Sequence, residues 1–231
     1  MPESGTVDPR PRVAFVNGGI LGLRSYATWL RHAFDASRDL HAEHLVLTEN
    51  LTTRERIIRR LLCAPLLPDI SGLHNADLSR FRCEYNAGLV ARRRLLAQGL
   101  DRFDVLHFHR QATAYASLDL MLRTPSIVSI DCTQACVLND TTSAIERMSL
   151  RPNVRRDGEI FRRAAAIVAM SRWAEADVRR MYPDCTTPIV VMPQPVRMDL
   201  LDAAWADERR QRRGTLPVSY THLTLPTIYS V

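Results

Sequence analysis

The chain of 231 residues contains no lysine, because all 31 of its basic residues are arginines. This absence excludes the phosphate-binding lysine of P-loop proteins and kinases, and it excludes a Schiff-base lysine. The G-x-S-x-G motif of serine hydrolases and the H-E-x-x-H motif of zinc proteases are also absent. Arginine without lysine, beside abundant alanine, indicates the codon usage of a GC-rich bacterial genome. We therefore do not interpret the net charge of +6 as a sign of a specific nucleic-acid partner.

Long hydrophobic runs are missing as well, since no stretch reaches the ~18 apolar residues that a membrane span needs. The composition, 46% hydrophobic and 24% charged, excludes disordered, collagen-like and disulfide-rich classes. Five cysteines, an odd number spread through apolar segments and preceded by no secretory signal, are expected to be reduced thiols. We expect a soluble cytoplasmic protein, for which a peripheral contact with a membrane surface stays open.

Residues 217–231 differ from the rest of the chain, because they contain no charged residue and no alanine. The string V-S-Y-T-H-L-T-L-P-T at 218–227 resembles the translation of a transposase-type sequencing adaptor, and such a tail would not belong to the natural folded domain. A natural strand pair rich in threonine and proline is the alternative. We expect an artefactual tail, and hence a natural protein that continues beyond Leu216.

The remaining sequence alternates short apolar runs with longer amphipathic ones. The short runs, rich in valine and isoleucine, predict buried parallel strands at 13–17, 45–48, 105–109, 126–131, 166–170 and 189–192. Helical spacing predicts helices at 25–36, 53–62, 78–100, 112–122, 144–163, 172–182 and 199–213. Strand followed by helix, repeated, predicts an α/β fold with a Rossmann-like, doubly wound parallel sheet.

Ligands bind beyond the carboxyl ends of the strands in such a sheet. After the first strand come Gly18 and Gly19, where glycine lets the backbone approach a ligand and helix amides face an anion. We expect this loop, on the cleft surface, to contact phosphate; a tight turn without a ligand is the alternative.

Polar residues follow two further strands. His107 and His109 share one face of their strand, with His109 nearest the cleft and His107 expected in the core. Asp131 and Thr133 follow the next strand and can bind hydroxyl groups or accept a proton, or else form only a helix cap. The C-x₃-C spacing of Cys132 is poor for zinc, so no metal site is predicted.

Four motifs follow the glycine loop in a fixed order: D-V-L-H-F-H, S-I-V-S-I-D, I-F-R-R-A-A-A-I-V-A-M-S-R-W and Y-P-D-C-T-T-P-I-V-V-M-P-Q-P-V. Their order and spacing resemble the N-terminal half of a GT-B glycosyltransferase, and within that class the retaining family 4. The resemblance covers residues 12 to about 213.

The resemblance implies that Gly18 and Gly19 face the diphosphate of a nucleotide-sugar donor, and that His109, Asp131 and Thr133 line the acceptor side. Many relatives have histidine where this chain has Asp131, and Pro195 replaces a glycine. The family's E-x₇-E pair belongs to a C-terminal donor domain, and no two glutamates here have that spacing.

The implied organisation is a lead-in at 1–11, an acceptor-side domain at 12–196, a helix and link at 197–216, and a donor domain missing from the chain. We therefore expect part of a glycosyltransferase, inactive alone, that uses a nucleotide-sugar co-substrate and no cofactor. Its acceptor would be a glycan, a lipid or a small molecule, and its catalytic residues are not identified. The alternatives are a dinucleotide-dependent oxidoreductase, with Glu49 as its ribose-binding acid, and a non-catalytic binding module.

Overall fold

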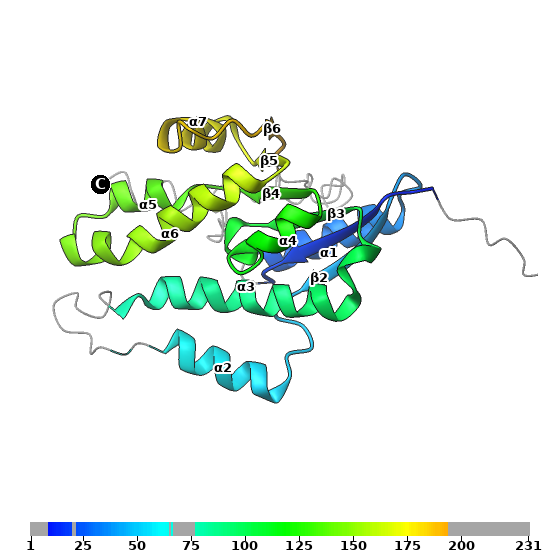
Figure 1. Ribbon diagram of the computed structural model, residues 1–231, viewed down its shortest axis with the longest axis horizontal. Coiled ribbons are helices and arrows are strands. Elements are labelled where there is room, and N and C mark those ends of the chain that lie inside the picture. The colour runs from blue at the N-terminus through cyan, green and yellow to red at the C-terminus, as the bar shows by residue number, and fades with distance from the viewer. Residues whose placement is uncertain (1–8, 20–21, 65, 67–76, 194–231) are drawn as a thin grey trace, which may run out of the picture.

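The computed structural model describes residues 9–19, 22–64, 66 and 77–193. In this part of the chain one parallel sheet has the strand order β2-β1-β3-β4-β5-β6 (Figure 1). The strands are β1 (Arg12–Asn17), β2 (His41–Val46), β3 (Val105–His109), β4 (Ser126–Ile130), β5 (Ala166–Ala169) and β6 (Ile189–Val191). The fold is therefore a Rossmann-like, doubly wound α/β sheet, as the sequence predicts.

Helices connect successive strands. They are α1 (Gly22–Asp35), α2 (Thr53–Cys63), α3 (Ser79–Gln98), α4 (Leu118–Arg123), α5 (Gln134–Asp140), α6 (Ala144–Arg163) and α7 (Arg172–Met181). Short 3₁₀ turns, η2 (Leu100–Arg102) and η3 (Gln111–Ala114), flank β3. No helix in the described ranges is long and apolar enough to cross a membrane.

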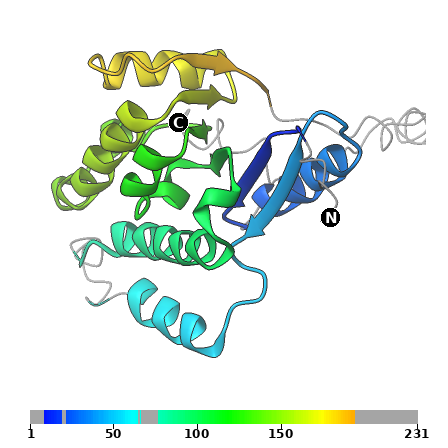
Figure 2. The same cartoon turned by 45° about the vertical axis from the view of Figure 1, so that its right-hand side comes forward.

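Each strand sends alternate side chains to opposite faces of the sheet. Phe108 of β3 is fully buried in the main core, with α3, α4, α6 and α7 packed on the same face. Phe15 of β1 points to the other face, where Tyr26 and Leu30 of α1 cover it. Figure 2 shows α1 and α3 on opposite sides of these strands. This arrangement confirms that the two histidines of β3 lie on the face opposite Phe108.

Two predicted helix starts are confirmed by their caps. The Thr52 hydroxyl accepts the Glu55 N–H at 3.2 Å, and the Glu55 carboxylate accepts the Thr52 N–H at 2.9 Å, which is a capping box. Ser171 accepts the Ala174 N–H at 3.1 Å at the start of α7. Local sequence therefore fixes where α2 and α7 begin.

Two sequence predictions are wrong in detail, and one helix was not predicted. The second strand starts at His41 and ends at Val46, whereas the apolar pattern predicted 45–48. The helix predicted at 112–122 is two short elements, η3 and α4, separated around the buried Ser117. Helix α5 was not predicted, because its seven residues are too few to show a helical period. The helix predicted at 199–213 and the tail at 217–231 lie outside the described residues.

Candidate functional site

A cavity of about 350 Å³ opens at the carboxyl edge of the sheet, between the ends of β1, β2 and β3 and the helices α2 and α3. The chain places β2 on one side of β1 and β3 on the other, so β1 and β3 form the topological switch point. The wall includes Gly18 after β1, Thr48 after β2 and His109 at the end of β3. The cavity therefore lies where ligands bind in sheets of this class.

The glycine turn after β1 is held by hydrogen bonds to Asn17 and Thr48. The Asn17 Oδ1 atom accepts the Gly19 N–H at 2.7 Å, and the Thr48 hydroxyl donates to the Gly19 carbonyl at 3.1 Å. Gly19 has a φ of +68°, and an added Cβ would lie 2.2 Å from Thr48 Oγ1. The expectation that this whole loop lies on the cleft surface is wrong for Gly19, which is buried against the end of β2. Gly18 does line the cavity.

His109 is fully buried beside this turn. Its Nδ1 atom lies 3.3 Å from Asn17 Nδ2, and its ring stacks on Tyr26 with centroids 4.2 Å apart. Since Asn17 Oδ1 already accepts the Gly19 N–H, the Asn17 amide nitrogen donates and His109 Nδ1 accepts.

Burial lowers the pKa of His109 to about 3, with the nearby His107 and Arg110 adding to the effect. The ring is therefore neutral at pH 7, and its one proton sits on Nε2. The buried Nε2 atom has no hydrogen-bond partner among the described residues. The end of β3 at His109 belongs to the cavity wall, while the His109 ring lies on the α1 face of the sheet against Phe15 and Tyr26.

His107 is partly buried and packs on the Phe15 ring, and its hydrogen-bonding is satisfied within the sheet. Its Nε2 atom lies 2.6 Å from the Ser129 hydroxyl, and burial lowers its pKa to about 4.

The two candidate site residues that follow β4, Asp131 and Thr133, do not line the cavity. Asp131 is exposed, and its Oδ1 atom accepts the Cys132 N–H at 2.9 Å. Thr133 is fully buried, and its hydroxyl accepts the Cys136 N–H at 3.1 Å as the cap of α5. The Thr133 N–H donates to Asp177 at 3.0 Å. The polar atoms of Thr133 are therefore engaged in holding α5 and α7 together.

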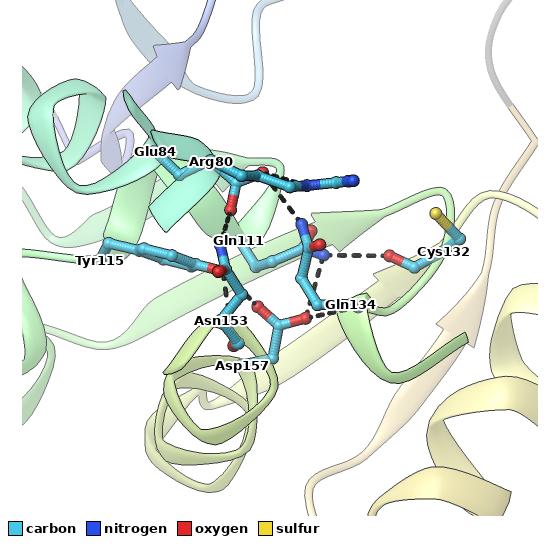
Figure 3. A network of polar contacts seen from close by, with 8 residues as sticks. All are labelled: Arg80, Glu84, Gln111, Tyr115, Cys132, Gln134, Asn153 and Asp157. Atoms are coloured by element: carbon cyan, nitrogen blue, oxygen red, sulfur yellow. Dashed lines mark hydrogen bonds and ion pairs between the residues drawn. The ribbon is translucent and has the colours of Figure 1, made fainter. Parts of the chain in front are cut away.

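Sequence reasoning missed a buried polar network centred on Asp157 of α6 (Figure 3). The Tyr115 hydroxyl lies 3.0 Å from Asp157 Oδ1, while Oδ2 accepts the Gln134 N–H at 2.9 Å and the Gln111 amide at 3.3 Å. Asp157 is completely buried, and this burial raises its pKa to about 8. The group is therefore largely protonated at pH 7.

Glu84 of α3 connects this network to the cavity. Its carboxylate accepts hydrogen bonds from the Gln134 amide at 3.0 Å and from the Asn153 amide, and it lines the cavity wall. Arg80 lies 3.6 Å from it, one helical turn earlier. The sequence holds one signal of this network, because Asn153 and Asp157 lie on the buried face of α6 with Phe161.

Within the described ranges, no group of three His, Cys, Asp or Glu side chains is placed to hold a metal ion. The described cysteines are free thiols, and burial raises the pKa of Cys132 to about 12. At this pKa the Cys132 thiol is protonated at neutral pH and is a poor nucleophile.

Comparisons with known proteins give a likeness in structure alone. No family model matches the chain, and no curated protein matches it. Among solved structures, the crystal structure of Arabidopsis thaliana UGT89C1 complexed with UDP-L-rhamnose is similar to this chain, with 11% sequence identity and a TM-score of 0.43. The match covers 84% of this chain and 55% of the plant protein, so the chain spans about half the length of that protein.

Proposed function

We propose that this chain is the acceptor-side domain of a GT-B glycosyltransferase similar to the retaining family 4. The observation that carries the proposal is the meeting of the glycine turn and His109 beside one cavity at the switch point of the sheet. The sequence resemblance supplies the reaction class, which is transfer of a sugar from a nucleotide-sugar donor.

In this proposal Gly18 approaches the donor diphosphate. The Gly19 N–H is already bonded to Asn17, so it does not contact the donor, and the role expected for Gly19 becomes that of a turn residue. Helix α1 starts at Gly22, shortly after β1 ends, so the positive end of its dipole lies at the same carboxyl edge of the sheet. Amides and a helix terminus stabilise the charge that develops on a leaving diphosphate.

The acceptor would occupy the cavity, with Gly18, Thr48 and the end of β3 at His109 in its wall. Leu47, Leu51 and Val90 give the wall an apolar part, and Glu84 and Arg110 give it a charged part. An acceptor with an apolar portion and a hydroxyl group matches this lining. Asp131, exposed one strand further along, remains a proposed contact at the edge of the acceptor site.

Catalysis in this proposal needs a second, donor-binding domain that supplies cations and the remaining nucleotide contacts. The domain limits 12–196 and 197–216 are part of the same proposal, as are retention of anomeric configuration and the inactivity of this chain alone.

The oxidoreductase alternative receives no support from Glu49. Its half-exposed carboxylate pairs with Arg31 at 3.5 Å, and Glu49 is not among the residues that line the cavity beside Gly18.

The test is a sugar-transfer assay on the gene product expressed in its natural reading frame, with product configuration read by NMR. We expect turnover with a nucleotide sugar and a drop of about 10²–10³ for Gly18→Val, the range seen when a charge-stabilising contact is lost. Leu122→Ala, at an exposed site on α4, is the matched control and should keep full activity. Nicotinamide dinucleotide binding without any sugar transfer would overturn the proposal in favour of an oxidoreductase.

A further inference from the structure

Helix α2 stands apart from the rest of the fold. Figures 1 and 2 both show it beyond α3, at the edge of the molecule. Of its eleven residues only Glu55 is buried. Its outward face carries Ile57, 55% exposed, and Leu61, 66% exposed, one helical turn apart, and Leu66 just after the helix is 67% exposed. Aliphatic side chains gathered in this way mark an interaction surface.

The same helix carries uncompensated positive charge. Its arginines are Arg54, Arg56, Arg59 and Arg60. All four are exposed, and none forms an ion pair with a carboxylate in the part of the chain that the structure describes. Glu55, the one acidic residue of α2, faces inward and pairs with Arg93 at 3.1 Å.

Other helices mix paired and unpaired arginines. On α6, Arg155 and Arg156 both pair with Glu159, at 3.2 Å and 2.9 Å, whereas the exposed Arg151 forms no ion pair with a described carboxylate. Helix α2 differs in that none of its four arginines forms such a pair within the described ranges.

A shallow depression of about 620 Å³ runs along one side of α2. Arg56, Arg59 and Arg60 line it together with Thr48 and Asn50. Three guanidinium groups around one open depression suit the phosphate of a lipid headgroup, since arginine binds phosphate with two parallel hydrogen bonds.

The charge and the aliphatic side chains of α2 together favour a bilayer as the partner. The helix carries four exposed arginines beside the exposed Ile57 and Leu61. On an anionic bilayer, apolar insertion and charge attraction act together.

We propose that α2 docks this protein on an anionic lipid bilayer. Ile57 and Leu61 insert between the headgroups, while Arg54 and Arg60, which flank them on the helix, contact lipid phosphates; Arg59 lies on the inner side, in the cavity wall. The inner side of the helix lines the cavity with Glu55 and Cys63, so docking holds the cavity next to the bilayer. This inference does not depend on the sugar-transfer reaction.

The experiment is co-sedimentation of the full chain with vesicles of phosphatidylcholine, with or without phosphatidylglycerol. We expect binding only to the anionic vesicles and a steep loss as salt is raised. Each of Arg54→Gln and Arg60→Gln should weaken the partition coefficient about fivefold. The double variant Ile57→Asp/Leu61→Asp should weaken it more than about tenfold.

Leu122→Asp/Met148→Asp is the matched control, because both side chains are also more than half exposed, at 74% and 55%, but lie on α4 and α6. This control should bind vesicles like the unmodified chain, and circular dichroism should show that all variants are folded. Absent binding to anionic vesicles would overturn the proposal, as would equal loss in the control. Dimerisation in sedimentation experiments that the α2 double variant abolishes, without vesicle binding, would assign the surface to a second copy instead.

Discussion

Asn17 and His109 face each other in register across the β1–β3 pair, and the Asn17 amide nitrogen donates to His109 Nδ1 at 3.3 Å. The same Asn17 side chain accepts the Gly19 N–H through its oxygen. One asparagine therefore ties the glycine turn to the histidine and also sets which ring nitrogen of His109 carries the proton.

We predict that His109 stays neutral, with its proton on Nε2, from pH 7 down to about pH 4. Its pKa of about 3 in the folded chain lies below the ordinary value of 6.5. Between pH 3 and pH 6.5 the unfolded chain therefore binds a proton on this ring that the folded chain does not bind. The free energy of unfolding should therefore decrease as pH falls below about 6.5. Long-range ¹H–¹⁵N NMR reports the tautomer, and His109→Gln should lose less stability on acidification than the unmodified chain. A ring that titrates near pH 6.5 would contradict this prediction.

Gly19→Ala is predicted to destabilise the fold. The added Cβ would lie 2.2 Å from Thr48 Oγ1 and 2.6 Å from Val46 Cγ1, and the left-handed backbone costs a further ~1–2 kcal/mol. Gly99→Ala is the matched control, because Gly99 also has a positive φ of +83° but its nearest side-chain atom lies 3.7 Å away. Urea unfolding should show a larger loss for Gly19→Ala than for Gly99→Ala, and equal losses would exclude the packing contribution.

Phe108→Ala should cost about 3–5 kcal/mol of unfolding free energy, because it removes a fully buried ring from the main core. Leu122→Ala, at a site 74% exposed, should change the stability by no more than about 0.5 kcal/mol. Thermal or urea unfolding of the two variants measures the difference. A small loss for Phe108→Ala would mean that the core around β3 relaxes to fill the space.

The sequence predicts those parts of the fold in which burial alone decides the residue pattern. Strands β3 and β4 are central and apolar, so their limits match the prediction within one residue. β2 is an edge strand, and its first four residues, from His41 to His44, are not fully buried. Polar residues are tolerated at such an edge, which is why the apolar pattern located only the end of β2.

The candidate site is predicted only in part, for a different physical reason. The switch-point rule places Gly18 and His109 at one edge of the sheet, and both line the cavity. The network around Asp157 joins Glu84, Tyr115 and Gln134 from elements far apart in the chain. Such pairings depend on how helices pack over the sheet, and no local pattern encodes them.

Asp157→Asn is predicted to change how stability depends on pH. The pKa of Asp157, about 8 in the folded chain, lies above the ordinary value of 3.8, so the folded state holds a proton that the unfolded state releases. This contribution to stability is complete below about pH 4 and is lost as pH rises toward about 8, with a slope of up to ~1.4 kcal/mol per pH unit. The amide introduced by this substitution cannot ionise, so the variant should gain stability relative to the unmodified chain as pH rises. Urea unfolding of both proteins at pH 5, 6, 7 and 8 measures this difference. A difference that stays constant with pH for Asp157→Asn would mean that Asp157 is ionised in the folded protein and that its three hydrogen-bond donors outweigh the cost of burial.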